Sequence, residues 1–199
     1  MTEETIRQAE KALIKQDPVL GKLIKGQKLG PLTPRSDYFH ALASSIISQQ
    51  ISTYAARAIF ARFQTATKLK PAKFLALAPE DIKAIGLSGQ KTKYIGDLAQ
   101  HFITDPNVYN HLERRTDEQV IEELTEIKGI GKWTAQMFLI FTLGRPDVFA
   151  PEDRGLQLGL MKLYGLDVLP PKAELELMAD KWQPYRSVAS LHLWHSLNQ

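Results

Sequence analysis

Two neighbouring carboxylates and a glycine-rich turn are the features of this sequence whose residue types could support chemistry. Glu152 and Asp153 end the loop sequence GRPDVFAPED, directly before a segment with helical periodicity. The turn Lys128-Gly129-Ile130-Gly131 lies upstream, between two further helical segments. A carboxylate before a helix is commonly an N-cap, and glycines between helices commonly form a plain turn. A chemical role therefore depends on what surrounds them.

The glycine turn predicts a phosphate-binding corner. Gly129 and Gly131 allow positive φ and leave backbone amides uncovered. These amides precede the helix that starts at Lys132, where free N–H groups and the helix dipole favour an anion. Lys132 adds positive charge, Thr134 adds a hydroxyl donor, and Ile130 can brace the turn from the core.

Composition limits the classes of function. The 199 residues include no cysteine, which excludes disulfides, cysteine nucleophiles and any iron–sulfur cluster held by thiolates. The five histidines show no strong metal-ligand spacing. A net charge of +3 permits a nucleic-acid partner without requiring one. No apolar run is long enough to cross a membrane, and the polar N-terminus does not resemble a signal peptide. The sequence predicts a cytoplasmic protein, nuclear in a eukaryote.

The periodicity of apolar residues is helical nearly everywhere, and no segment alternates as a strand would. The sequence therefore predicts an all-α fold with short loops. Ser36, Asp37 and Ser52 are expected helix caps. The expected helices cover residues 38–50, 52–64, 72–77, 79–85, 91–102, 117–127, 132–143, 153–164, 171–182 and 186–197.

Longer stretches resemble a known family. The segment LTEIKGIGKWTA, residues 124–135, looks like the helix-hairpin-helix motif of DNA-binding proteins. Together with the aspartate of VFAPED, it resembles the helix-hairpin-helix/GPD superfamily of DNA glycosylases. The segments DPVLGKLI, FHALASSIISQQIS and WQPYRSVASLHLW are similar to the alkylbase branch, the 3-methyladenine DNA glycosylase II type. The chain resembles its minimal members, which lack an extra N-terminal domain.

The resemblance implies a monofunctional enzyme that cleaves the N-glycosidic bond of alkylated purines, such as 3-methyladenine and 7-methylguanine, during base excision repair. Asp153 matches the family's aspartate, which stabilises an oxocarbenium-like transition state. Glu152 is the alternative carboxylate. Trp133 stands where bifunctional members carry a lysine that forms a Schiff base, so water is the expected nucleophile.

The resemblance also implies residues that hold the DNA. The target base must leave the stack, and an aromatic pocket would then favour a cationic base. Gln50 matches the residue that fills the gap in the duplex, and the alternative is a loop glutamine that faces water. The backbone carbonyls of Thr125, Ile127 and Gly129 match those that bind an alkali cation, Na⁺ or K⁺. The expected pocket residues are Trp133, Trp194, Met137, Arg154 and Tyr54, with Trp182 and Tyr185 as weaker choices.

The expected architecture has two helical lobes. Residues 36–147 would form a helical barrel containing the hairpin, and residues 1–35 with 148–199 would form the second lobe, with the damaged base in the cleft between them. The expected partner is double-stranded DNA with alkylated bases, bound by a monomer that needs no cofactor for catalysis. Two alternatives are a non-catalytic helix-hairpin-helix DNA-binding protein and a glycosylase for oxidised or mismatched bases.

Overall fold

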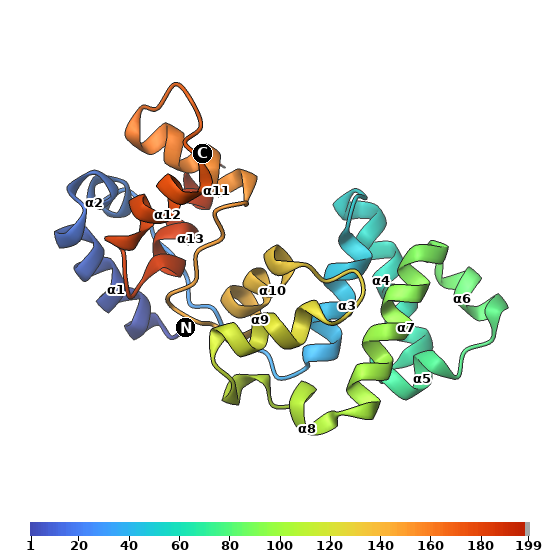
Figure 1. Cartoon of the computed structure of the whole chain (residues 1–199). Helices are drawn as coiled ribbons and strands as arrows, with labels where there is room; N and C mark the ends of the chain where they lie inside the picture. The colour runs from blue at the N-terminus through green and yellow to red at the C-terminus, as the bar shows by residue number, and fades with distance from the viewer. Residues whose placement is uncertain (198–199) are drawn as a thin grey trace. The chain divides into compact units, whose positions relative to one another are not determined.

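A computed structural model describes residues 1–197 and confirms the all-α prediction, since that part of the chain contains helices and no strand (Figure 1). The helices form two compact units, residues 1–34 with 139–199 and residues 35–138. None of the helices in the described residues is long and apolar enough to span a membrane. Nor do residues 1–197 hold a cluster of three or more acidic or histidine side chains that could bind a metal ion.

The central unit, residues 35–138, contains the glycine hairpin. Phenylalanine rings form the middle of its core, where Phe39 packs against Phe63 and Phe102 with ring centroids 6.2 and 5.6 Å apart. Two of the predicted caps are confirmed, because Asp37 accepts a hydrogen bond from His40 N and Ser52 accepts one from Ala55 N. Ser36 is not a cap, since Asp37 holds the N-cap position of α3. Its helices are α3 (Tyr38–Ser48), α4 (Thr53–Thr67), α5 (Pro71–Leu75), α6 (Pro79–Ile85), α7 (Gly89–Thr104), α8 (Pro106–Tyr109), η1 (Leu112–Arg114), α9 (Asp117–Thr125) and α10 (Lys132–Phe138).

The terminal unit brings the two ends of the chain together, because the N-terminal helices α1 and α2 pack against α13 near the C-terminus (Figure 1). Its elements are α1 (Glu3–Gln16), α2 (Pro18–Lys25), η2 (Leu139–Leu143), α11 (Arg154–Tyr164), α12 (Lys172–Asp180) and α13 (Arg186–Ser196).

A buried carboxylate links the helices of this terminal unit. Asp17 is 2% exposed, and its Oδ1 caps α2 by accepting hydrogen bonds from Val19 N and Leu20 N. Its Oδ2 accepts hydrogen bonds from the Tyr164 hydroxyl and from Trp182 Nε1. Burial alone would raise the pKa of Asp17, but these hydrogen bonds outweigh burial and lower it to about 2. Asp17 therefore stabilises the terminal unit as an anion.

The helix predicted over residues 132–143 is α-helical only to Phe138 and continues as the π-helical turn η2. The compact units also divide after Phe138, whereas the predicted barrel ran to Asp147. The segment after Phe138 belongs with the terminal unit because its backbone is bonded there: Ser187 N donates to Pro146 O at 3.0 Å. The short elements α8 and η1 were not expected from the sequence, since one turn of helix carries too few residues to show periodicity.

Candidate active site

Asp153 is held by two hydrogen bonds on one of its oxygens. It is the N-cap of α11, and its Oδ1 accepts from Leu156 N at 2.8 Å. The same oxygen accepts from the indole Nε1 of Trp194, on α13, also at 2.8 Å. The side chain is half-buried. Two donors fix the carboxylate's orientation.

The neighbouring carboxylate, Glu152, lies in a different setting. It is exposed and forms an ion pair with Lys172 at the start of α12. A salt bridge with an exposed lysine neutralises part of its charge and directs it towards α12. The two carboxylates therefore differ in their surroundings, and Asp153 is the one with the geometry of a fixed, oriented anion.

A glycine makes the contact between Trp194 and Asp153 possible. A Cβ added to Gly155 would lie 2.9 Å from Trp194 Cδ1, 3.0 Å from its Nε1 and 3.1 Å from Asp153 Oδ1. The indole is supported from another side by Phe141, with ring centroids 5.5 Å apart and a tilted geometry. The ring, the carboxylate and the bare backbone of Gly155 thus pack as one group.

The loop that leads to Asp153 is attached to the same helix that carries Trp194. Arg186, at the start of α13, donates through Nε to Asp147 Oδ1 at 2.9 Å and through Nη2 to Asp147 Oδ2 at 3.0 Å. Val148 N donates to the hydroxyl of the buried Ser187 at 2.8 Å. Sequence reasoning missed Asp147, Arg186 and Ser187, because the partners lie 39 positions apart and neither segment alone indicates the pairing.

The glycine hairpin has the backbone conformation that its sequence predicts at Gly129, whose φ is +86°. A Cβ there would lie 2.2 Å from Tyr94 Cδ2, so glycine is required on both steric and conformational grounds. Ile130 is 4% exposed and braces the turn as expected. Lys132 and Gly131 are exposed. Thr134 is 6% exposed, and its role as a hydroxyl donor to a phosphate stays a prediction.

The loop between α3 and α4 presents Gln50 to solvent. Gln50 adopts a left-handed conformation with φ of +55°, and its side chain is exposed. Tyr54, in the first turn of α4, is 86% exposed, so within its own unit its ring lines no enclosed pocket. Its role in a base pocket stays a prediction.

The other predicted pocket residues differ in their surroundings. Trp133 is 43% exposed and Met137 is half-buried, and they lie one turn apart on α10, so they share a face. Arg154 is exposed and its Nη1 lies 3.4 Å from Gln157 Oε1. Trp182 is fully buried and bonded to Asp17, so it belongs to the core and not to a pocket.

The predicted alkali cation was assigned to the carbonyls of Thr125, Ile127 and Gly129. Ile127 O accepts from Ile130 N at 3.0 Å, and Gly129 O accepts from Gln49 Nε2 at 2.9 Å. A carbonyl oxygen has two lone pairs, so these groups can also ligate a hard cation. The cation stays a prediction.

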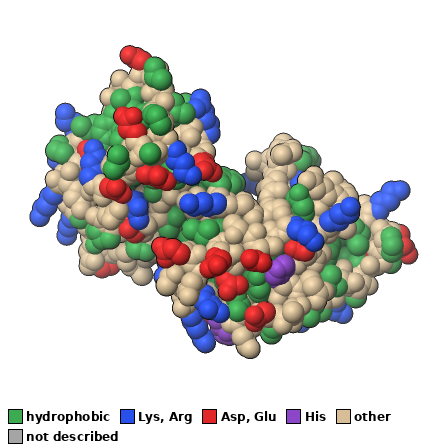
Figure 2. Space-filling model, in the orientation of Figure 1, with side chains coloured by type: hydrophobic (Ala, Val, Ile, Leu, Met, Phe, Trp, Pro, Cys, Tyr) green, Lys and Arg blue, Asp and Glu red, His purple; other side chains and the backbone are tan. Residues whose placement is uncertain are grey.

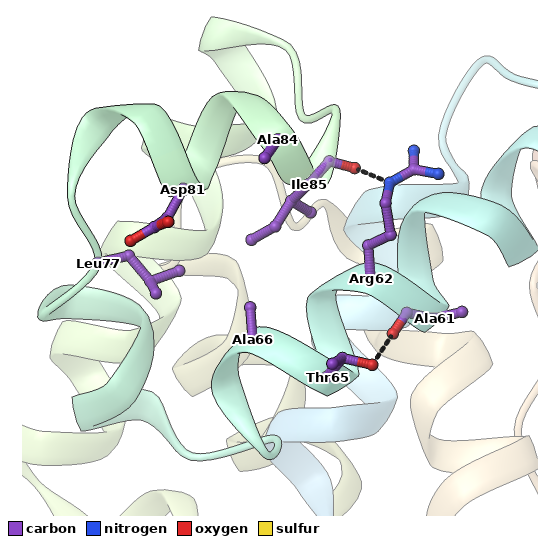
Figure 3. Close-up of a pocket in the computed structure, with 8 residues that line it drawn as sticks. All are labelled: Ala61, Arg62, Thr65, Ala66, Leu77, Asp81, Ala84 and Ile85. Atoms are coloured by element: carbon purple, nitrogen blue, oxygen red, sulfur yellow. Dashed lines mark hydrogen bonds between the residues drawn. The ribbon is translucent and has the colours of Figure 1, made fainter.

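Two surface features carry no part of this site. On the face drawn in Figure 2, Lys and Arg side chains are scattered, and several acidic side chains lie close together in the lower middle of the view. A pocket of about 560 Å³ lies between α4 and α6 (Figure 3), and its only basic side chain, Arg62, donates through Nε to Ile85 O at 2.8 Å. That guanidinium is used to cap α6.

The fold and the site together define an all-helical protein with a glycine hairpin between two helices and a fixed carboxylate at the start of a later helix. Residues 43–184 match the HhH-GPD superfamily of base excision DNA repair proteins.

Relatives of this chain support the match. It is 36% identical over 197 residues to a DNA-3-methyladenine glycosylase of Saccharomyces cerevisiae, covering 90% of this chain and 66% of the relative. It is 31% identical to DNA-3-methyladenine glycosylase 1 of Schizosaccharomyces pombe, covering 88% of this chain and 79% of the relative. The chain thus spans about two thirds of the length of the Saccharomyces cerevisiae relative, and 61% of the length of a relative in Bacillus subtilis.

Solved structures agree. A DNA-3-methyladenine glycosidase of Bacillus halodurans is 36% identical with a TM-score of 0.83, covering 94% of this chain and 88% of that one. The 3-methyladenine DNA glycosylase of Schizosaccharomyces pombe in complex with abasic DNA is 29% identical with a TM-score of 0.80, covering 96% and 97%. This chain belongs to the HhH-GPD superfamily, as its motifs predict.

Proposed function

We propose that this protein is a monofunctional DNA glycosylase that hydrolyses the N-glycosidic bond of alkylated purines, of the 3-methyladenine and 7-methylguanine type. The observation that carries the proposal is the double hydrogen bond that holds Asp153 Oδ1 between Leu156 N and Trp194 Nε1. The named activities of the similar proteins, and the abasic DNA bound by one of them, support the substrate class.

The chemistry follows from the charge that develops at the sugar. Cleavage of a glycosidic bond passes through an oxocarbenium-like transition state, and a nearby carboxylate stabilises that positive charge. Oδ1 of Asp153 is committed to two donors, and this fixes where Oδ2 lies. A carboxylate whose position is set before the reaction does not spend free energy on reorganisation. It also orients water for attack at the sugar carbon.

The leaving group and the nucleophile fit a monofunctional reaction. An alkylated purine carries positive charge and departs without a strong general acid. Trp133 cannot form a Schiff base with the sugar, so water is the nucleophile and an abasic site is the product. Its exposed indole offers a π face that attracts a cationic base.

DNA is held by the backbone at the hairpin and by a residue that enters the duplex. Exposed Lys132 and the amides after Gly131 contact a phosphate next to the lesion. Gln50 fills the space that the everted base leaves, since it is exposed on a loop tip and its amide can hydrogen-bond an orphaned base.

The test is Asp153→Asn. Asparagine is as good an N-cap as aspartate, so α11 and the fold should persist. We expect release of 3-methyladenine from methylated duplex DNA to be lost, while the Kd for DNA stays within about twofold of the original. If Asp153→Asn kept full activity, the catalytic role proposed for Asp153 would be refuted. A wild-type protein that binds DNA and releases no base from any lesion duplex would be a binding module only.

A further inference from the structure

The loop that carries Gln50 holds a conformation that a glutamine does not choose by itself. A non-glycine residue at φ of +55° is strained, and the conformation persists where its surroundings over-determine it. We call residues 49–52, between α3 and α4, the wedge loop. What fixes this loop lies outside it, on α7 and on the glycine hairpin.

Lys91 of α7 fixes the start of the wedge loop. Its Nζ donates to Ile47 O at 2.7 Å and to Gln49 O at 2.8 Å. Ile47 lies in the last turn of α3 and Gln49 is its C-cap residue, where backbone oxygens lack partners within the helix and a cation is favoured. Burial lowers the pKa of Lys91, so part of its hydration is replaced by the two carbonyls.

Gln49 ties the wedge loop to the hairpin. Its Nε2 donates to Gly129 O at 2.9 Å, across 80 positions in the sequence. Gly129 is itself immobilised, because its backbone is left-handed and the ring of Tyr94 packs directly on it. The amide of Gln49 therefore ends on a rigid part of the hairpin.

One side of α7 contacts both the wedge loop and the glycine hairpin. Lys91 binds the wedge loop, Tyr94 packs on Gly129, and Asp97 Oδ2 accepts from Lys128 N at 2.9 Å. These three residues are spaced by three along the helix, which keeps them on one side of it. The hairpin and the wedge loop are thus positioned against a common helix, with the bond from Gln49 closing the arrangement.

We propose that Gln49 and Lys91 are positioning residues that hold Gln50 at a fixed distance from the hairpin, so that the protein enters the duplex with its wedge already formed. The inference rests on the proposed function, since it concerns how the base is everted. It assigns no chemistry to either residue. If the loop became ordered only on each encounter with DNA, the loss of its conformational entropy would add to the free energy of base flipping. A preformed loop avoids this cost.

The experiment separates base eversion from cleavage. Gln49→Met and Lys91→Met remove the donors and keep side-chain length, and Lys91→Arg restores donors and charge. Lys93→Met, at an exposed position of the same helix, is the control for lost charge. Single-turnover excision is measured on one alkylated purine in a paired duplex and in a bulge. Fluorescence of 2-aminopurine next to an abasic analogue reports entry of the wedge into the duplex, without cleavage.

We expect both methionine variants to excise about tenfold more slowly from the paired duplex and to lose the fluorescence change. On the bulged substrate, where the base is already unstacked, the loss should fall below about threefold. Lys91→Arg should recover most of the rate, and Lys93→Met should match the wild type. Adding Gln49→Met to Gln50→Ala should cost no more than Gln50→Ala alone, because one acts through the other.

The inference would be overturned if the methionine variants lost the same factor in excision rate on paired and bulged substrates. It would also be overturned if the effects of Gln49→Met and Gln50→Ala on that rate were fully additive. A wild-type protein that excises no alkylated base would refute the proposed function instead. In that case the fluorescence comparison still decides the inference, because it requires no bond cleavage.

Discussion

Replacing Gly155 with alanine tests whether the position of the Asp153 carboxylate sets the reaction rate. The new Cβ would lie 2.9 Å from Trp194 Cδ1, about 0.5 Å inside the 3.4 Å at which ordinary contact begins. The indole must retreat, and its N–H bond to Asp153 Oδ1, now 2.8 Å, must lengthen or bend. The backbone need not change, because the φ of Gly155 is not positive.

Two effects on stability nearly offset each other. Overpacking costs about 1–3 kcal/mol, while alanine is favoured over glycine in a helix by about 1 kcal/mol. We expect the free energy of unfolding to fall by about 0–2 kcal/mol, a decrease in Tm of at most about 8 °C for a chain of this size. The protein stays folded at 25 °C, so activity can be compared directly.

The rate should respond more strongly than stability. A displacement of about 1 Å in a positioned group can cost about a hundredfold in rate, so a shift of half that size should lower the single-turnover rate of base release by about tenfold. The Kd for duplex DNA should not change, because Gly155 is not among the residues proposed to hold the backbone. The assay is release of 3-methyladenine with enzyme in excess, beside a filter-binding or anisotropy titration.

Gly159→Ala is the matched control. It lies one turn further along α11, and its Cβ would meet Leu193 Cβ of α13 at 3.0 Å. It disturbs the same pair of helices without touching the carboxylate or the indole. We expect a similar change in Tm with a nearly unchanged rate. The reasoning is refuted if Gly155→Ala keeps the wild-type rate, or if Gly159→Ala loses as much activity.

Three further predictions use other contacts. Trp194→Phe keeps the ring that packs on Phe141 but loses the donor to Asp153, so single-turnover release should slow by about tenfold with DNA binding kept; unchanged release would show that the indole N–H does not orient the carboxylate. Lys132→Ala should weaken binding to all sequences and reduce the slope of log K against log salt by about 1 in titrations; an unaltered slope would exclude a phosphate contact. The pKa of Asp17 lies near 2, below its ordinary 3.8, so its contribution of about 2 kcal/mol is present above about pH 4 and is lost as the pH falls towards 2. Denaturant titrations at several pH values should show this loss in the wild type and not in Asp17→Asn, and parallel curves for the two proteins would contradict it.

Much of the fold could be predicted because helix positions and helix caps depend on residues that are close together in the sequence. The spacing of apolar residues set most of the helices, and Asp37 and Ser52 were recognisable as caps from the residues that follow them. The left-handed turn at Gly129 was likewise predictable, because glycine is the residue that adopts this conformation without strain. The end of α10 at Phe138 was not predictable in this way, since the apolar pattern continues through the π-helical turn.

By itself the sequence determined the carboxylate and the hairpin, and only the tertiary structure decided what holds them. Asp153 as an N-cap follows from its neighbours, but its bond to Trp194 spans 41 positions, and the bond from Gln49 to Gly129 spans 80. Neither pairing leaves a periodic or motif signal, because each depends on how two helices cross and on the space that a missing side chain leaves at Gly155. Side-chain identity is local information, whereas the partner of a side chain is a property of packing. The sequence therefore identified the candidate groups for the chemistry, and the fold decided which side chains orient them.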